Sequence, residues 1–200
     1  RVRSSAASDV YKRQIYILAR KMKAEGRLPC SAAVGTLHTN MGVEAGLAKL
    51  GIDLVRTDIG DHNVIRCMCE AGLALGGEQS GHIILSEFLP TGDGVFAGAK
   101  LARALKESGK KLSELADCQV FPQRNAEVAT RHKEKIARDK TLLHYVAAIE
   151  DMLGDSGRIM LRPSGTEKKL RIMAESRDAF LADFAARSIE LFIRTQFELL

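Results

Sequence analysis

The segment Arg162–Glu167, with sequence RPSGTE, combines the groups that bind a phosphate. Its proline fixes one backbone dihedral and its glycine permits a tight turn, so successive backbone N–H groups can converge on an anion. Ser164 and Thr166 add hydroxyl donors, and the guanidinium of Arg162 can bind two phosphate oxygens at once. The segment therefore predicts a phosphate-binding loop. A polar hairpin turn in which Arg162 pairs with Glu167 would have the same composition.

A second loop, Gly76–His82, has the sequence GGEQSGH. Glycines on both sides expose the carboxylate of Glu78 and the hydroxyl of Ser80 on a tight turn at the edge of a predicted strand, where α/β sheets place their ligands. A carboxylate that accepts two hydrogen bonds suits the neighbouring hydroxyl groups of a sugar. This loop predicts a sugar-binding site, with a solvated turn as the alternative.

Two histidines lie close to the second loop in the sequence. His82 ends the loop and could assist proton transfer at a reacting hydroxyl, or it could brace the loop through a hydrogen bond. His62 could present a cation to a phosphate when it is protonated, or it could be an exposed residue at the start of a helix. Both are candidate assisting groups.

The elements expected to position these loops alternate between helix and strand. Helical spacing begins at residue 15, strands are predicted at 32–36, 52–56 and 83–85, and helices at 43–50, 63–71 and 93–107, with a glycine-rich turn before residue 83. This rhythm predicts an α/β domain over residues 15–117, built from βαβ units with a mixed, mostly parallel sheet.

A different rhythm follows residue 108. Strand-like segments at 119–121 and 126–130, a charged turn at 131–135 and a helix at 141–153 precede strands at 158–161 and 170–174. Asp178 is expected to cap a last helix that runs to the C-terminus. We expect a small α+β domain over residues 118–200, with the RPSGTE loop between its last two strands.

The first fourteen residues (RVRSSAASDVYKRQ) are basic, rich in serine and alanine, and without periodicity. They lack the apolar stretch of a signal peptide. We expect residues 1–14 to be either a scar joined to a truncated gene or a natural disordered arm.

The composition favours a small anionic ligand over nucleic acid. The 200 residues are 46% hydrophobic and 28% charged, which is typical of a globular protein, and the formal net charge is only +5. Aromatic residues make up 5%, so a base-stacking surface is poorly supported. The four cysteines form no disulfide framework and no apolar run is long enough to span a membrane. We expect a cytoplasmic protein that binds neither nucleic acid nor membranes.

Taken together, the two loops resemble those of the α-D-phosphohexomutase superfamily, from about Arg27 to the C-terminus. In that family four domains surround a cleft, and the resemblance implies that this chain holds most of the third domain and the whole fourth domain. It implies that Glu78 and Ser80 bind sugar hydroxyls. It also implies that phosphate is bound by Arg162, Ser164, Gly165, Thr166 and Arg171.

The segments Gly77–His82 and Thr91–Gly94 resemble the branch of the superfamily that acts on glucosamine phosphates. The implied reaction interconverts glucosamine 6-phosphate and glucosamine 1-phosphate through glucosamine 1,6-bisphosphate and a phosphoserine, with Mg²⁺ as cofactor. The sequence has no matching serine nucleophile loop and no Asp-rich metal loop. We therefore expect the catalytic serine and the metal on missing N-terminal domains, and a chain that binds phosphosugar without turning it over. Alternatives are a sister enzyme for mannose or glucose phosphates, or a non-catalytic phosphosugar-binding module.

Overall fold

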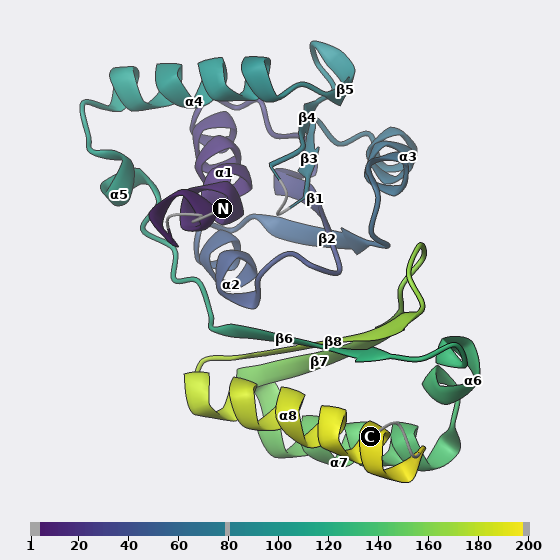
Figure 1. The fold of residues 1–200 in the computed structure, drawn as a ribbon. Helices are drawn as coiled ribbons and strands as arrows, with labels where there is room; N and C mark the ends of the chain where they lie inside the picture. The colour runs from purple at the N-terminus through teal and green to yellow at the C-terminus, as the bar shows by residue number, and fades with distance from the viewer. Residues whose placement is uncertain (1–4, 79–80, 198–200) are drawn as a thin grey trace. The chain divides into compact units, whose positions relative to one another are not determined.

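The computed structural model describes residues 5–78 and 81–197, and the chain divides into two compact units between Val120 and Phe121 (Figure 1). The predicted fold class is confirmed, because a mixed α/β unit precedes a smaller unit with its own antiparallel sheet. The division lies three residues beyond the expected boundary after residue 117.

The first unit is built on a five-stranded sheet with the order β2-β1-β3-β4-β5. Strand β1 (Ala32–Thr36) runs parallel to β2 (Asp53–Thr57) and to β3 (Leu75–Gly77). Strands β4 (Ile83–Leu85) and β5 (Leu89–Gly92) continue the sheet in antiparallel fashion. The glycine-rich turn expected before residue 83 is partly a strand. Gly76 and Gly77 belong to β3, and the chain turns only after Gly77.

Helices cover both faces of this sheet (Figure 1). Leu18 of α1 (Ser5–Ala24) and Leu47 of α2 (Met41–Lys49) share one core with Leu75 of β3, and α4 (Gly94–Ser108) joins the same core. Helix α3 (Asp61–Ala71) packs on the other face, where its Val64 and Met68 meet Ala32, Val34 and Ile84. A short helix, α5 (Leu112–Leu115), and a 3₁₀ turn at Pro29–Ser31 complete the unit.

The first helix differs from the expectation for the N-terminal segment. Residues 5–14 are helical rather than a disordered arm, and they continue without a break into the predicted helix at residue 15. The sequence from Ser5 to Ala24 contains neither glycine nor proline, so nothing interrupts the backbone hydrogen bonds. Residues 15–19 are all buried, which anchors the helix to the core.

The second unit is a three-stranded antiparallel sheet with the order β6-β8-β7. Its strands are β6 (Gln123–Ala129), β7 (Gly157–Pro163) and β8 (Lys169–Ser176). A single strand, β6, replaces the two strand-like segments expected at 119–121 and 126–130. The expected charged turn at 131–135 is confined to residues 131–132, because Lys133–Ala137 form a helix, α6, whose Ile136 is buried.

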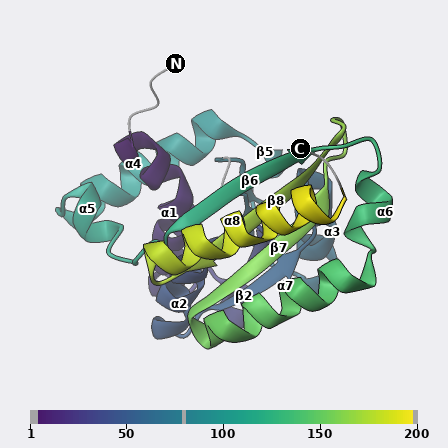
Figure 2. The same ribbon diagram turned by 60° about the horizontal axis from the view of Figure 1, so that its bottom comes forward.

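Two long helices, α7 (Lys140–Leu153) and α8 (Ala179–Gln196), lie along this sheet (Figure 2). Leu170, Ile172 and Ala174 of β8 share a core with both helices, so the intervening residues of β8 belong to the opposite face of the sheet. The carboxylate of Asp178 accepts a hydrogen bond of 2.7 Å from the backbone N–H of Phe180, which confirms the predicted cap. Within residues 5–78 and 81–197, no helix combines the length and apolar character needed to cross a membrane.

Candidate functional site

Glu78 directly follows β3, at the carboxyl edge of the parallel strands. The backbone N–H of Glu78 donates a 3.0 Å hydrogen bond to the carbonyl oxygen of His82, and the N–H of Gly81 donates one of 3.1 Å to the carbonyl of Glu78. Gly81 adopts a φ of +95°, which a residue with a side chain rarely does. The turn therefore brings Glu78 and His82 side by side. Ser80 lies outside the described residues, so its role stays a prediction.

The carboxylate of Glu78 is oriented by the start of α3. Its Oε1 accepts a 2.9 Å hydrogen bond from the backbone N–H of Gly60, which precedes the helix with a φ of +122°. The side chain is half-buried. A carboxylate fixed in this way presents acceptor oxygens in a set direction, as recognition of sugar hydroxyls requires.

The two candidate histidines flank the same helix start. His82 is exposed and its Nδ1 lies 3.2 Å from a carboxylate oxygen of Asp61. This contact matches the bracing role considered for His82. His62 is exposed on the first turn of α3, the environment of the helix-start alternative.

Asp61, Glu78 and His82 bring one ligand atom each to within 4.8 Å of one another, the one such metal-ligand group among the residues that the structure describes. Its donors are two carboxylates and an imidazole nitrogen. Mg²⁺ prefers an all-oxygen set, so this group does not fit the magnesium ion that the resemblance implies.

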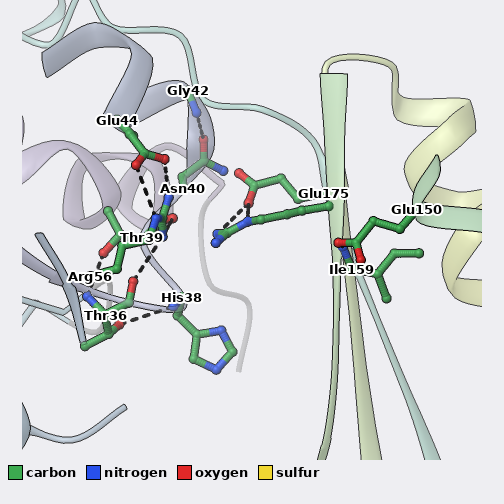
Figure 3. Close-up of polar contacts among 11 residues, drawn as sticks. Thr36, His38, Thr39, Asn40, Gly42, Glu44, Arg56, Glu150, Ile159 and Glu175 are labelled. Carbon is green, nitrogen blue, oxygen red and sulfur yellow. Dashed lines mark hydrogen bonds and ion pairs between the residues drawn. The ribbon is translucent and has the colours of Figure 1, made fainter. Parts of the chain in front are cut away.

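The loop after β1 lies at the same edge of the sheet, and the sequence analysis did not identify the contacts that Arg56 makes with it (Figure 3). The guanidinium of Arg56 donates hydrogen bonds to the carbonyl oxygens of Thr36 and Thr39, at 3.2 and 2.8 Å, and forms an ion pair with Glu44 at 2.5 Å. Asn40 accepts a 2.9 Å hydrogen bond from the N–H of Gly42 and caps α2. The loop ties β1, β2 and α2 together beside the carboxyl edge.

In the second unit the RPSGTE segment connects β7 to β8. The N–H of Ser164 donates a 2.9 Å hydrogen bond to the carbonyl of Lys169, and the hydroxyl of Ser164 accepts one of 3.3 Å from the N–H of Glu167. Ser164 is only 3% exposed, whereas Gly165 and Thr166 are exposed. The buried serine thus closes the loop, and its exposed tip carries backbone N–H groups that can face a ligand.

Arg162 and Arg171 are direct partners in the register of β7 and β8, at the base of this loop. Burial, and then the positive charge of Arg171, lower the pKa of Arg162 below its ordinary value. Arg171 forms an ion pair with Glu167 at 2.5 Å, and its buried Nε lies 3.5 Å from a carboxylate oxygen of Glu127. Glu167 therefore pairs with Arg171 and Lys169. The hairpin alternative had expected it to pair with Arg162.

Lys133 is a further residue of this loop that the sequence analysis did not identify. It lies on α6, a helix that the run of charged residues did not predict. Its Nζ donates hydrogen bonds to the carbonyl oxygens of Ser164 and Glu167. No local pattern could have found it, because the contact joins positions more than thirty residues apart.

Farther along the same sheet, Glu175 is fully buried. It accepts a 2.9 Å hydrogen bond from Nε of Arg158 (Figure 3). The Glu150 carboxylate accepts one of 3.0 Å from the N–H of Ile159. These contacts hold β7 in register with β8 and with the end of α7, and so fix the strand that carries Arg162.

Comparison with known proteins shows which family combines these two units. Residues 12–121 match the family described as phosphoglucomutase/phosphomannomutase, alpha/beta/alpha domain III, and residues 123–189 match the C-terminal domain of the same family. The two matched regions follow the two units of the structure.

Curated relatives include the phosphoglucosamine mutase of Acetivibrio thermocellus, which is 43% identical over 165 residues, covering 81% of this chain and 37% of that protein. The phosphoglucosamine mutase of Leuconostoc citreum is 39% identical over 183 residues, covering 91% of this chain and 40% of that protein. The chain thus spans less than half the length of these relatives.

Solved structures with the same fold include N-acetylphosphoglucosamine mutase from Aspergillus fumigatus, with a TM-score of 0.75 at 19% identity over 94% of this chain and 43% of that chain. A phosphoglucomutase/phosphomannomutase family protein from Burkholderia thailandensis has a TM-score of 0.71 at 18% identity, over 94% and 42%. With both of its units matched, the chain belongs to the phosphoglucomutase/phosphomannomutase family of phosphohexomutases.

Proposed function

We propose that this chain supplies the sugar-binding and phosphate-binding parts of a phosphoglucosamine mutase, an isomerase that interconverts glucosamine 6-phosphate and glucosamine 1-phosphate in the cytoplasm. The observation that carries the proposal is the pair Arg162 and Arg171, opposite each other at the base of the RPSGTE loop. Two like charges in register repel each other, Arg171 is only partly neutralised by Glu167 and Glu127, and a phosphate dianion bound between the two guanidinium groups would neutralise the pair. The curated relatives favour glucosamine as the sugar.

In this proposal the two units recognise different parts of one substrate. Arg162, Ser164, Gly165, Thr166 and Arg171 bind the phosphate that is not transferred. Glu78 and Ser80 bind sugar hydroxyls. Because the loop of the second unit reads only phosphate, it can hold the substrate through either its 1-phosphate or its 6-phosphate.

The chemical step belongs to segments outside these 200 residues. A phosphoserine there transfers its phosphoryl group to the free hydroxyl of the bound sugar phosphate, which gives glucosamine 1,6-bisphosphate. The bisphosphate reorients, and its other phosphoryl group returns to the serine. Mg²⁺ held by those outside segments would neutralise negative charge on the transferring group. The chain by itself binds substrate without turning it over.

Calorimetric titration of the chain with glucosamine 6-phosphate at low salt tests the binding part, with Arg162→Ala as control. Binding that the variant loses supports the proposal. The full activity is tested in a fusion of the chain behind the N-terminal domains of a phosphoglucosamine mutase relative, with glucosamine, glucose and mannose 6-phosphates as competing substrates. Full activity of the fusion with both Glu78→Ala and Arg162→Ala would refute the proposed binding site. A preference for mannose 6-phosphate or glucose 6-phosphate would refute glucosamine as the sugar.

A further inference from the structure

We propose that Lys133 is a positioning residue for the phosphate-binding loop: its ammonium group fixes two loop carbonyls and thereby turns the loop N–H groups toward the anion. Its Nζ lies 2.5 Å from the carbonyl oxygen of Ser164 and 3.0 Å from that of Glu167. The inference rests on the proposed phosphate-binding function of this loop.

The direction of the loop N–H groups follows from peptide geometry. All described peptide bonds are trans, so the C=O of Ser164 and the N–H of Gly165 point in opposite directions in one plane. The same relation joins the C=O of Glu167 to the N–H of Lys168. Because Lys133 holds both carbonyls, the N–H groups of Gly165 and Lys168 point away from α6.

A second contact holds the same side of the loop. The backbone N–H of Thr130 donates a 2.9 Å hydrogen bond to the carbonyl oxygen of Lys168. Three loop carbonyls therefore face the segment formed by Thr130 and Lys133. Carbonyl oxygens repel an anion, so collecting them on one side leaves the other side to N–H and hydroxyl donors.

The burial of Lys133 distinguishes it from Lys135, the other lysine of its helix. Its side chain is only 16% exposed and it lies 3.6 Å from the Glu134 carboxylate, farther than from either loop carbonyl. Lys135, two positions along α6, is exposed. Replacement of Lys135 thus removes the same charge from the same helix without removing the two carbonyl contacts.

The experiment compares Lys133→Met, Lys133→Arg and Lys135→Met in the 200-residue chain. Amide hydrogen exchange by NMR reports on the loop at Glu167 and Thr130, whose N–H groups donate to the Ser164 hydroxyl and to the Lys168 carbonyl, with Leu170 and Ile172 as folding controls. We expect Lys133→Met to speed exchange in the loop about tenfold or more while the β8 amides stay protected. Lys133→Arg should keep most of the protection, and Lys135→Met should match the unmodified chain.

Titration with inorganic phosphate on the same samples supplies the functional readout. We expect Lys133→Met to weaken phosphate binding about tenfold or more, and Lys135→Met to weaken it less than twofold. Equal losses in both lysine variants with unchanged loop exchange would overturn the proposal, because the effect would then be long-range charge alone. Should the unmodified chain bind no phosphate, the proposed function fails, and unchanged loop exchange in Lys133→Met separately refutes the positioning role.

If the Lys133→Met chain does not fold, Lys133→Gln becomes the deciding variant. Its amide is uncharged and reaches one bond less far than the lysine side chain, so it should keep the two carbonyl contacts only in part. Intermediate loop protection with a folded core is the expected result. Loop exchange equal to that of the unmodified chain, together with unchanged phosphate binding, would refute the proposal.

Discussion

The backbone N–H of Gly60 and the Oε1 atom of Glu78, eighteen residues apart, form a 2.9 Å hydrogen bond. The contact joins the start of α3 to the end of β3. It sets the direction of a carboxylate that stands at the carboxyl edge of three parallel strands, the edge at which α/β sheets bind ligands.

Replacement of Glu78 by glutamine should separate sugar recognition from phosphate recognition. The amide oxygen can still accept the hydrogen bond from Gly60, but the variant loses the charged acceptor for sugar hydroxyls. A hydrogen bond to a charged group contributes about 1.5–3 kcal/mol, so affinity for glucosamine 6-phosphate should fall about tenfold or more. Calorimetry should show that affinity for inorganic phosphate is unchanged. A parallel loss for both ligands would mean that Glu78 maintains the fold and not the sugar contact.

Replacement of Arg162 by methionine should abolish phosphate binding without weakening the fold. The variant removes a half-buried cation that stands opposite Arg171, and like charges directly opposite each other destabilise a sheet. Thermal unfolding should show an unchanged or higher midpoint without phosphate. Added phosphate should raise the midpoint of the unmodified chain but not that of the variant.

A matched control for Arg162 lies on the same strand. Arg158→Met removes the ion-pair partner of the fully buried Glu175 carboxylate, and removing one member of a buried pair costs about 3–5 kcal/mol. Its unfolding midpoint should fall whether or not phosphate is present. If Arg162→Met destabilised the chain as strongly as Arg158→Met, the primary role of Arg162 would be structural.

Replacement by alanine at two helical glycines, Gly46 and Gly98, should change the free energy of unfolding in opposite directions. At Gly46 in α2 a new Cβ would lie 2.6 Å from the Cβ of Cys118, and overpacking of this kind costs about 1–3 kcal/mol. At Gly98 in α4 a Cβ would meet nothing within 4 Å. There the helix propensity of alanine should stabilise the chain by up to about 1 kcal/mol. Urea unfolding should place the midpoint of Gly46→Ala below that of the unmodified chain and that of Gly98→Ala above it, and shifts of the same sign would contradict the packing at Gly46.

The thiol of Cys118 should make stability depend on pH in the alkaline range. Burial, the largest influence, raises its pKa from 9.0 to about 11. Above pH 9 the unfolded chain loses this proton before the folded chain does, so stability falls as the pH rises from about 9 to 11. The loss should reach about 2–3 kcal/mol across that window. The difference in unfolding free energy between the unmodified chain and Cys118→Ala should shrink accordingly, and a constant difference would show that the folded chain ionises this thiol as easily as the unfolded one.

Most elements could be predicted from the sequence because each has a strong local pattern. Strand β1 and helix α8 fall where hydrophobic spacing and the Asp178 cap place them. Strand β3 could not be predicted, since two of its three residues are glycines. Its formation depends on close packing, because a Cβ on Gly76 would approach the Met68 sulfur to 2.4 Å.

The two candidate binding loops could be identified from the sequence, but the residues that hydrogen-bond to them from other elements could not. Glycine and proline spacing identifies the RPSGTE segment locally. Lys133, in contrast, lies in a run of charges without apolar periodicity, and only the buried Ile136 anchors its helix. The hydrogen bonds that it makes depend on how β6, α6 and the β7–β8 hairpin meet in three dimensions, which spacing along the chain does not encode.

The strand order β6-β8-β7 has a consequence for the lifetime of the phosphate loop. Strand β8 is paired on both sides over residues 170–175, so we expect its amides to be the most protected of the second unit. The loop continues directly into this central strand. Opening of the loop base therefore requires unfolding of the small sheet, whereas the tip, held by Lys133, can open by itself.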